Sequence, residues 1–175
     1  HTLSLHDALP IYLTTGQYNI AIGSDACGDL RIGSNNIAIG YDSLSYIYSN
    51  SDNVSIGHAS GFYAEGNSNI FIGTDAGRAN YNTTPNNNVI IGHQAGYSLK
   101  TGGDGNVLIG YKAGYSLEAK GHNIIIGCDC DAPSIYHEYQ LNIGNAIHGD
   151  LATARLGLGG MEENTNLQIS LKADA

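Results

Sequence analysis

The sequence predicts an all-β fold, a parallel β-solenoid of about eight coils with 16–19 residues each. Three observations support this fold class. An Ile-Gly pair recurs along the chain, β-branched residues precede each glycine at a spacing of two, and turn-forming residues separate the copies. Only 13% of the 175 residues are charged and Ile and Val are abundant, a composition that argues against a disordered chain. We therefore expect stacked coils without any long helix.

Each copy of the repeat reads Asn, then Ile or Val, a variable residue, Ile and Gly, and a degenerate last copy starts at Gln140. Successive glycines are 17, 17, 16, 19, 18, 17 and 17 residues apart. Glycine permits a backbone conformation or a close approach that a side chain would block. Asparagine at a strand entrance tolerates turn geometry and can bond to the copies above and below. These repeat-turn residues are Gly23, Gly40, Gly57, Gly73, Gly92, Gly110, Gly127 and Gly144, with Asn19, Asn36, Asn53, Asn69, Asn88, Asn106 and Asn123.

The residue before each glycine is always Ile, and a second β-branched or leucine side chain lies two positions earlier. A spacing of two places both on one face of a strand, which we expect to be the buried face. A second strand is expected after each glycine, where small and large apolar residues alternate with polar ones, as at Ala26 and Leu30. The predicted buried ladder is Ile22, Ile39, Ile56, Ile72, Ile91, Ile109, Ile126 and Ile143.

The residue between the two apolar rows should then point outwards. In four consecutive copies it is large and apolar: Phe71, Ile90, Leu108 and Ile125. A soluble monomer rarely exposes such a patch, so we expect these four residues to form a trimer interface. The alternative is a strand with both faces covered by its own chain.

The chain divides into three parts. Residues 2–11, TLSLHDALPI, resemble the conceptual translation of a sequencing-library adapter, so residues 1–11 are interpreted as a non-native segment. Residues 12–148 form the solenoid repeat domain, and residues 149–175 are a C-terminal extension that we interpret as truncated.

The pattern N-[IV]-x-I-G-x-x-[AS] resembles the head repeats of YadA-like trimeric autotransporter adhesins and the repeats of bacteriophage tail fibres and tailspikes. The copies IGHQAGYSL and IGYKAGYSL, and the ending QLNIGNAIHGDL, are closer to the tail-fibre type, whereas adhesin heads repeat at a shorter period. The resemblance covers residues 16–159. It implies a left-handed β-roll, a homotrimer, and attachment to a glycan or protein receptor from a virion tail or a bacterial surface.

The sequence offers no catalytic, metal-binding or cofactor-binding motif, and we expect none of these functions. Left-handed β-helix acyltransferases share the hexapeptide pattern, but their coils need three such hexapeptides and each coil here has one. A net charge of −9 argues against nucleic acid as a partner, and no apolar run is long enough for membrane insertion.

Several polar residues fit turns or packing better than they fit metal binding. His58 and His93 lie two coils apart, about 10 Å, which is too far for joint metal binding within one chain. Cys128-Asp129-Cys130 looks like a short metal motif, but Cys130 occupies the Ala column and Cys27 follows an Ala in it, so these cysteines are interpreted as small hydrophobic residues. The recurring aspartates after the glycines fit a solvated turn edge, and the tyrosines near turns could recognise a glycan or protein surface.

Overall fold

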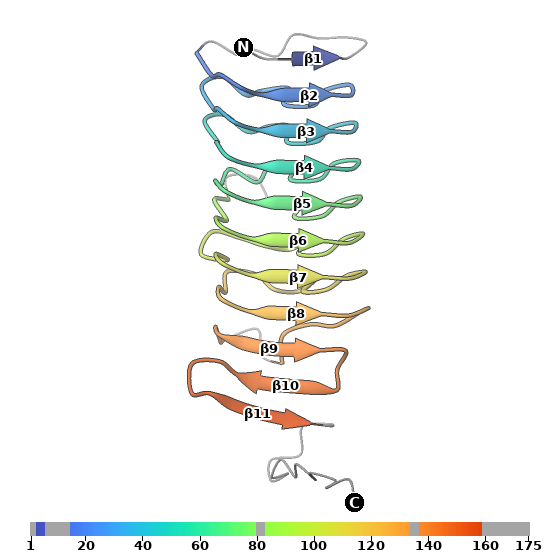
Figure 1. Cartoon of the computed structure of the whole chain (residues 1–175), viewed down its shortest axis with the longest axis vertical. Helices are drawn as coiled ribbons and strands as arrows, with labels where there is room; N and C mark the ends of the chain where they lie inside the picture. The colour runs from blue at the N-terminus through green and yellow to red at the C-terminus, as the bar shows by residue number, and fades with distance from the viewer. Residues whose placement is uncertain (1–2, 6–14, 80–82, 134–136, 159–175) are drawn as a thin grey trace, which may run out of the picture.

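The computed structural model describes residues 3–5, 15–79, 83–133 and 137–158. It confirms the β-solenoid: the described residues contain strands and turns but no helix, and all strands belong to one sheet in sequence order (Figure 1). The strands are β1 (Leu3–Leu5), β2 (Ile20–Ile22), β3 (Ile37–Ile39), β4 (Val54–Ile56), β5 (Ile70–Ile72), β6 (Val89–Ile91), β7 (Val107–Ile109), β8 (Ile124–Ile126), β9 (Gln140–Ile143), β10 (Ile147–Asp150) and β11 (Arg155–Leu158). β1 lies in the adapter-like segment, and we give it no part in the function.

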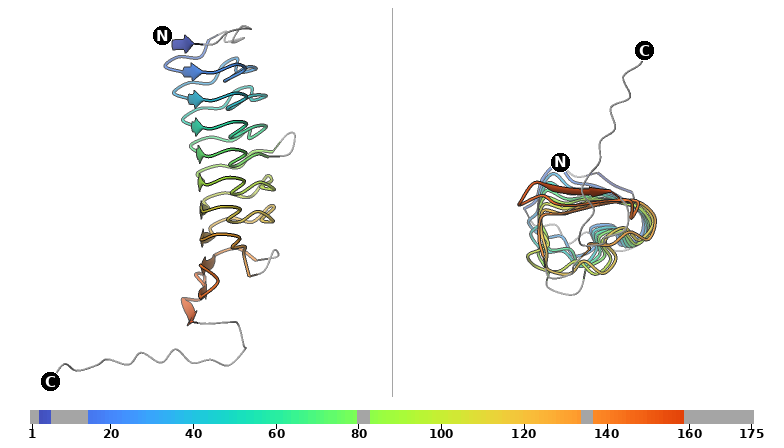
Figure 2. Two further views of the ribbon diagram at one scale, coloured as in Figure 1. Left: turned by 90° about the vertical axis from the view of Figure 1, so that its right-hand side faces the viewer. Right: turned by 90° about the horizontal axis from the view of Figure 1, so that it is seen from below.

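Parallel pairing joins β1 through β9, and each position of a strand pairs with the same position of the next repeat, as Ile20 does with Ile37. Viewed along the rod axis, the coils superpose and the sheet forms one wall (Figure 2). After β9 the chain turns back, and β10 and β11 extend the sheet in antiparallel fashion. The last, degenerate repeat therefore leads into a hairpin instead of another coil.

The inner face of the sheet is the opposite of the predicted one. The central residue of each strand points into the coil, and Phe71, Ile90, Leu108 and Ile125 are fully buried. The predicted buried ladder is half-buried or exposed instead, with Ile22 at 36% and Ile56 at 37%. A spacing of two identifies the residues that share a face, but it does not tell which face is inside when both are apolar.

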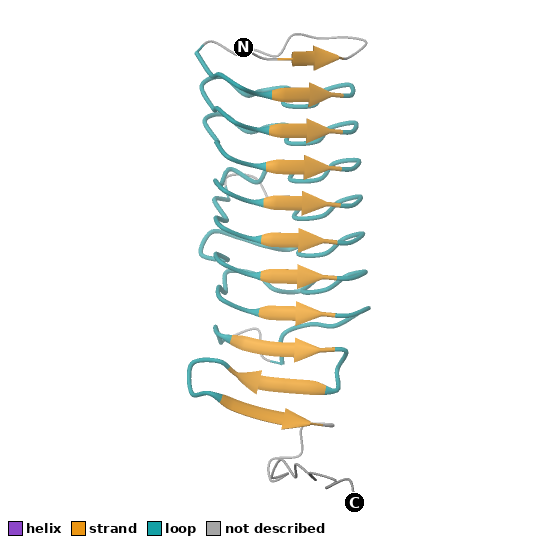
Figure 3. Cartoon of the chain, viewed as in Figure 1, coloured by secondary structure: helices purple, strands orange, loops and turns teal. Residues whose placement is uncertain are grey.

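Within the described residues, each coil from β2 to β8 has one short strand, and the expected second strand is wrong (Figure 3). The residues two and four positions after the strand glycine have left-handed backbone geometry, for example Asp25 (φ 54°) and Cys27 (φ 54°). Such residues form successive turns and cannot continue a pleated strand. The predicted burial holds at Ala26 and Leu30, which are buried within the turn segment, whereas the large residues five positions after the glycine, such as Phe62, are half-buried. Leu151, at the corresponding place in the last copy, is exposed.

The core of each coil combines the central strand residue with the residue four positions after the glycine. Where the first is small, as Ala38, the second is large, as Leu44. Where the first is large, as Phe71, the second is glycine, as Gly77. A Cβ added at Gly61 would lie 2.7 Å from Phe71 Cδ2, so glycine makes room for that ring.

Candidate functional site

A ladder of asparagine side chains runs along the inside of the rod at the strand entrances. Asn36 donates from its backbone N–H and from Nδ2 to Asn19 Oδ1, at 2.9 and 3.0 Å. The same pair of bonds repeats at every step to Asn123, and the Gln140 backbone N–H completes the series at 2.8 Å. The ladder residues are buried and their amides are used within the chain, so the expected bonding between copies is confirmed. The ladder sets the register of the stack and leaves no group for a ligand.

The strand glycines form a second column in which backbone approaches backbone. From Gly23 to Gly127 their φ values lie between 125° and 138°, a region that disfavours other residues. A Cβ added at Gly73 would lie 2.7 Å from the carbonyl carbon of Gly92 in the next coil. This confirms the predicted close approach and makes the column structural.

The outer face of the sheet is a candidate interaction surface. Two apolar side chains per strand point away from the coil, and Ile56 and Ile70 are both 37% exposed. Neither row contains a charged or polar residue. We call these residues the outer apolar face: Ile20, Ile22, Ile37, Ile39, Val54, Ile56, Ile70, Ile72, Val89, Ile91, Val107, Ile109, Ile124, Ile126, Leu141 and Ile143.

The predicted trimer stripe is therefore wrong. Phe71, Ile90, Leu108 and Ile125 are inaccessible to a partner because they fill the core of their own chain. The apolar side chains that remain accessible on the strands lie in the rows on either side of these four residues.

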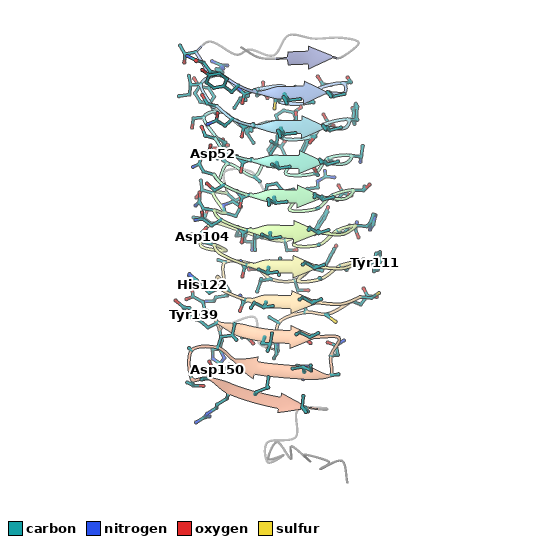
Figure 4. All side chains as sticks on the ribbon, in the orientation of Figure 1. Asp52, Asp104, Tyr111, His122, Tyr139 and Asp150 are labelled. Carbon is teal, nitrogen blue, oxygen red and sulfur yellow. The ribbon has the colours of Figure 1, made fainter. Side chains whose placement is uncertain are left out.

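Aromatic and cationic side chains stack along the turn edge, which we define as the turns that follow the strand glycines. At the first turn position, Tyr41 stacks on His58 (5.4 Å between ring centroids) and His93 on Tyr111 (5.5 Å). At the fifth turn position, Phe62, Arg78, Tyr97 and Tyr115 form another column, in which the Tyr97 and Tyr115 ring centroids are 5.2 Å apart. Figure 4 places Tyr111 at the turn edge, at the opposite end of the strands from Asp52, Asp104, His122 and Tyr139.

Charged groups on the turn edge are partly paired. Arg78 Nη1 lies 2.9 Å from Asp75 Oδ1. Burial, followed by the nearby Asp25 carboxylate, raises the pKa of Asp42, while His58 and Arg78 act in the opposite direction. The predicted solvated aspartate column consists of left-handed turn residues at Asp25, Asp42, Asp75 and Asp129.

The cysteines differ in accessibility. Cys27 and Cys130 are buried, whereas Cys128 is exposed. Burial raises the pKa of Cys27 to about 12, so this thiol lacks the thiolate that nucleophilic chemistry requires. Among the residues that the structure describes, no group of His, Cys, Asp and Glu could hold a metal ion.

Sequence reasoning missed the outer apolar face and the ordered ring stacks. The composition of both strand faces was visible, and the aromatic residues at the first turn position were visible as a column. The direction of each face depends on the path of the turns, which follows from the left-handed residues at non-glycine positions such as Leu44 (φ 48°).

Within the described ranges, no helix is long and apolar enough to cross a membrane. Comparison with protein-family models, with curated proteins and with solved structures yields no match to this chain.

Proposed function

We propose that this chain is a rod-forming segment of a homotrimeric fibre that attaches to a cell surface, on a phage tail or, as the alternative, on a bacterial surface as an adhesin head. The observation that carries the proposal is the outer apolar face, which continues along β2–β9 without a charged side chain. The proposal includes no catalytic, metal-binding or cofactor-binding role.

The size of the outer apolar face fits an interface between copies. A standard interface buries about 800 Å² on each partner, which corresponds to about 50 Å² from each of the sixteen side chains. Ile22, Ile56 and Ile70, each 36–37% exposed, contribute an area of this order, and the other thirteen half-buried side chains contribute less. Apolar patches of such extent on a soluble protein mark interaction sites.

A second copy of the same chain is the partner that fits this face best. The face is built from identical layers, one per coil, so a parallel copy in register meets the same residues in every layer. A threefold axis parallel to the rod would bring three outer apolar faces together, so that none of them stays open to solvent. The turn edge lies beside this face and keeps aromatic side chains such as Tyr41 and Tyr111, each about half exposed, available to a receptor.

The architecture also favours a fibre over the acyltransferase alternative. Each coil from β2 to β8 contains one strand of three residues, and turns complete the coil. Acyltransferase coils of the resembling class need three hexapeptide motifs. A rod with a single wall of strands and a single apolar face suits lateral assembly.

The test compares Ile56→Lys with Ile32→Lys in sedimentation velocity. Both changes replace an exposed isoleucine, 37% and 51% accessible, but only Ile56 lies on the outer apolar face. Ile56→Lys places like charges against each other on the axis and should yield folded single chains. Ile32→Lys should sediment as the unmodified protein does. Equal behaviour of the two variants would remove the support for assembly through this face.

A further inference from the structure

The first turn position carries an interrupted stack of rings. Hydrogen bonds between coils fix its order: Asp75 N–H donates to the His58 carbonyl and Gln94 N–H to the Thr74 carbonyl, both at 2.9 Å. Thr74 therefore lies in the layer between His58 and His93. The series along the rod is Tyr41, His58, Thr74, His93 and Tyr111, which is symmetric in residue type about the threonine.

Among the described residues, each of the two histidine rings has an aromatic stacking partner on one side. His58 is nearly parallel to Tyr41, with 9° between the ring planes, and His93 is nearly parallel to Tyr111, with 8°. Both imidazoles are exposed, and the described residues place no ring on the sides that face Thr74. Two coils separate the histidines, or about 9.6 Å at the usual strand spacing. The stack thus lacks one ring in the layer of Thr74.

The neighbouring column shows that this layer can hold a planar group. At the fifth turn position of the same coil, the Arg78 guanidinium lies 5.0 Å from the Phe62 ring centroid and 6.0 Å from that of Tyr97. The planar series is continuous there. In the column at the first turn position, by contrast, the short side chain of Thr74 interrupts the series of rings.

We propose that the gap between His58 and His93 binds one neutral aromatic ring that projects from a protein partner, such as a tyrosine or tryptophan side chain. A ring midway would lie about 4.8 Å from each imidazole, within the roughly 4.5–7 Å range of stable aromatic pairs. Asp75 next to the gap and the net charge of −9 disfavour an anionic ligand. The proposal does not depend on the fibre function, since the gap belongs to a single chain.

A site made of two ring contacts is weak by itself. We expect a dissociation constant of roughly millimolar for an isolated aromatic amide. Several copies of the site in one assembly, each holding a side chain of the same partner surface, would raise the effective affinity. The gap is therefore suited to anchor one side chain within a larger contact.

Proton NMR of the histidine side chains in the full chain tests the proposal. The probe is N-acetyltryptophanamide, with N-acetylleucinamide as the apolar control and methyl glucoside as a neutral pyranose. His58→Gln and His93→Gln assign the two signals among the seven histidines. An inserted ring should shift His58 and His93 upfield together and leave the other five histidines in place. No shift, or a shift of one of the two alone, overturns the proposal.

Variants at Thr74 supply the matched pair. Thr74→Tyr adds the missing ring from within the chain and should abolish the shifts, whereas Thr74→Val keeps the gap and should retain them. If Thr74→Tyr does not fold, His58→Ala serves instead, because it removes one exposed wall and should weaken binding several-fold. Binding that Thr74→Tyr or His58→Ala leaves unchanged contradicts the proposal. Shifts caused by methyl glucoside but not by the aromatic amide would make the gap a saccharide site and overturn it as well.

Discussion

At the scale of single residues, adjacent positions in one strand have opposite roles. Ile90 is fully buried in the coil, and Ile91 lies half-buried on the outer apolar face. Isoleucine at two successive positions therefore stabilises the core of one chain at position 90 and the proposed contact between chains at position 91.

Replacing each of these isoleucines with asparagine separates the two roles. Ile90→Asn buries an unpaired amide, which costs about 1–3 kcal/mol beyond the lost packing, so it should lower the free energy of unfolding far more than Ile91→Asn. Urea denaturation in the Ile56→Lys background, where we expect single chains, measures both. Equal losses, or a larger loss for Ile91→Asn, would contradict the assignment of the faces.

Gly77 tests the fit between the strand core and the turn. Its φ is 60°, and an added Cβ would collide with the Phe71 ring. Gly77→Ala should destabilise the chain by about 1–3 kcal/mol from overpacking, in addition to roughly 1 kcal/mol of backbone strain. The control is Gly102→Ala, which has φ 90° but a nearest neighbour at 3.5 Å. Similar losses in thermal unfolding for both variants would mean that the ring does not need the glycine.

At the scale of elements, the asparagine ladder replaces the long strands that this solenoid lacks. Strands of three residues offer few ladder hydrogen bonds, so the side-chain amides extend the bonding between coils. Asn88 Oδ1 accepts from the Asn106 backbone N–H at 2.8 Å and from Asn106 Nδ2 at 3.1 Å. One amide thus satisfies two buried donors of the next coil.

Asn88→Ala should therefore leave the buried Asn106 backbone N–H without a partner, whereas Asn106 Nδ2 keeps its bond to the Lys120 carbonyl at 3.1 Å. The expected loss is about 1–3 kcal/mol for an unsatisfied buried group, with increased hydrogen exchange at the Asn106 amide. Asn35→Gly removes an exposed amide whose side-chain bond among the described residues is to Asp52 Oδ1, and it keeps the left-handed backbone, so its effect should be small. Comparable losses, or unchanged exchange at Asn106, would show that the ladder contributes little.

The sequence predicts the elements of this fold only in part. The period, the parallel stacking of the coils, the asparagine column and the buried Ala26 and Leu30 follow from patterns that repeat in every coil. The direction of the sheet faces does not follow, because both faces are apolar. The turns were mistaken for strands because alternation of buried and polar residues also arises in successive turns, and no sequence rule places Leu44 in a left-handed conformation.

At the scale of the whole molecule, the rod is thin and one wall of it is apolar. Its core holds few large side chains per coil, and the outer apolar face stays open to solvent along β2–β9 in a single chain. Burying that face would add about 25 cal/mol for each Å² removed from water. Burial of the outer apolar face would then both assemble the proposed fibre and stabilise the rod.

Sedimentation equilibrium of the unmodified protein tests this account most directly. Association of three chains through the outer apolar face predicts a mass three times the 18.4 kDa of one chain, with β-rich circular dichroism. A folded, soluble single chain of 18.4 kDa over the same concentrations would contradict it, because the outer apolar face would then need no partner.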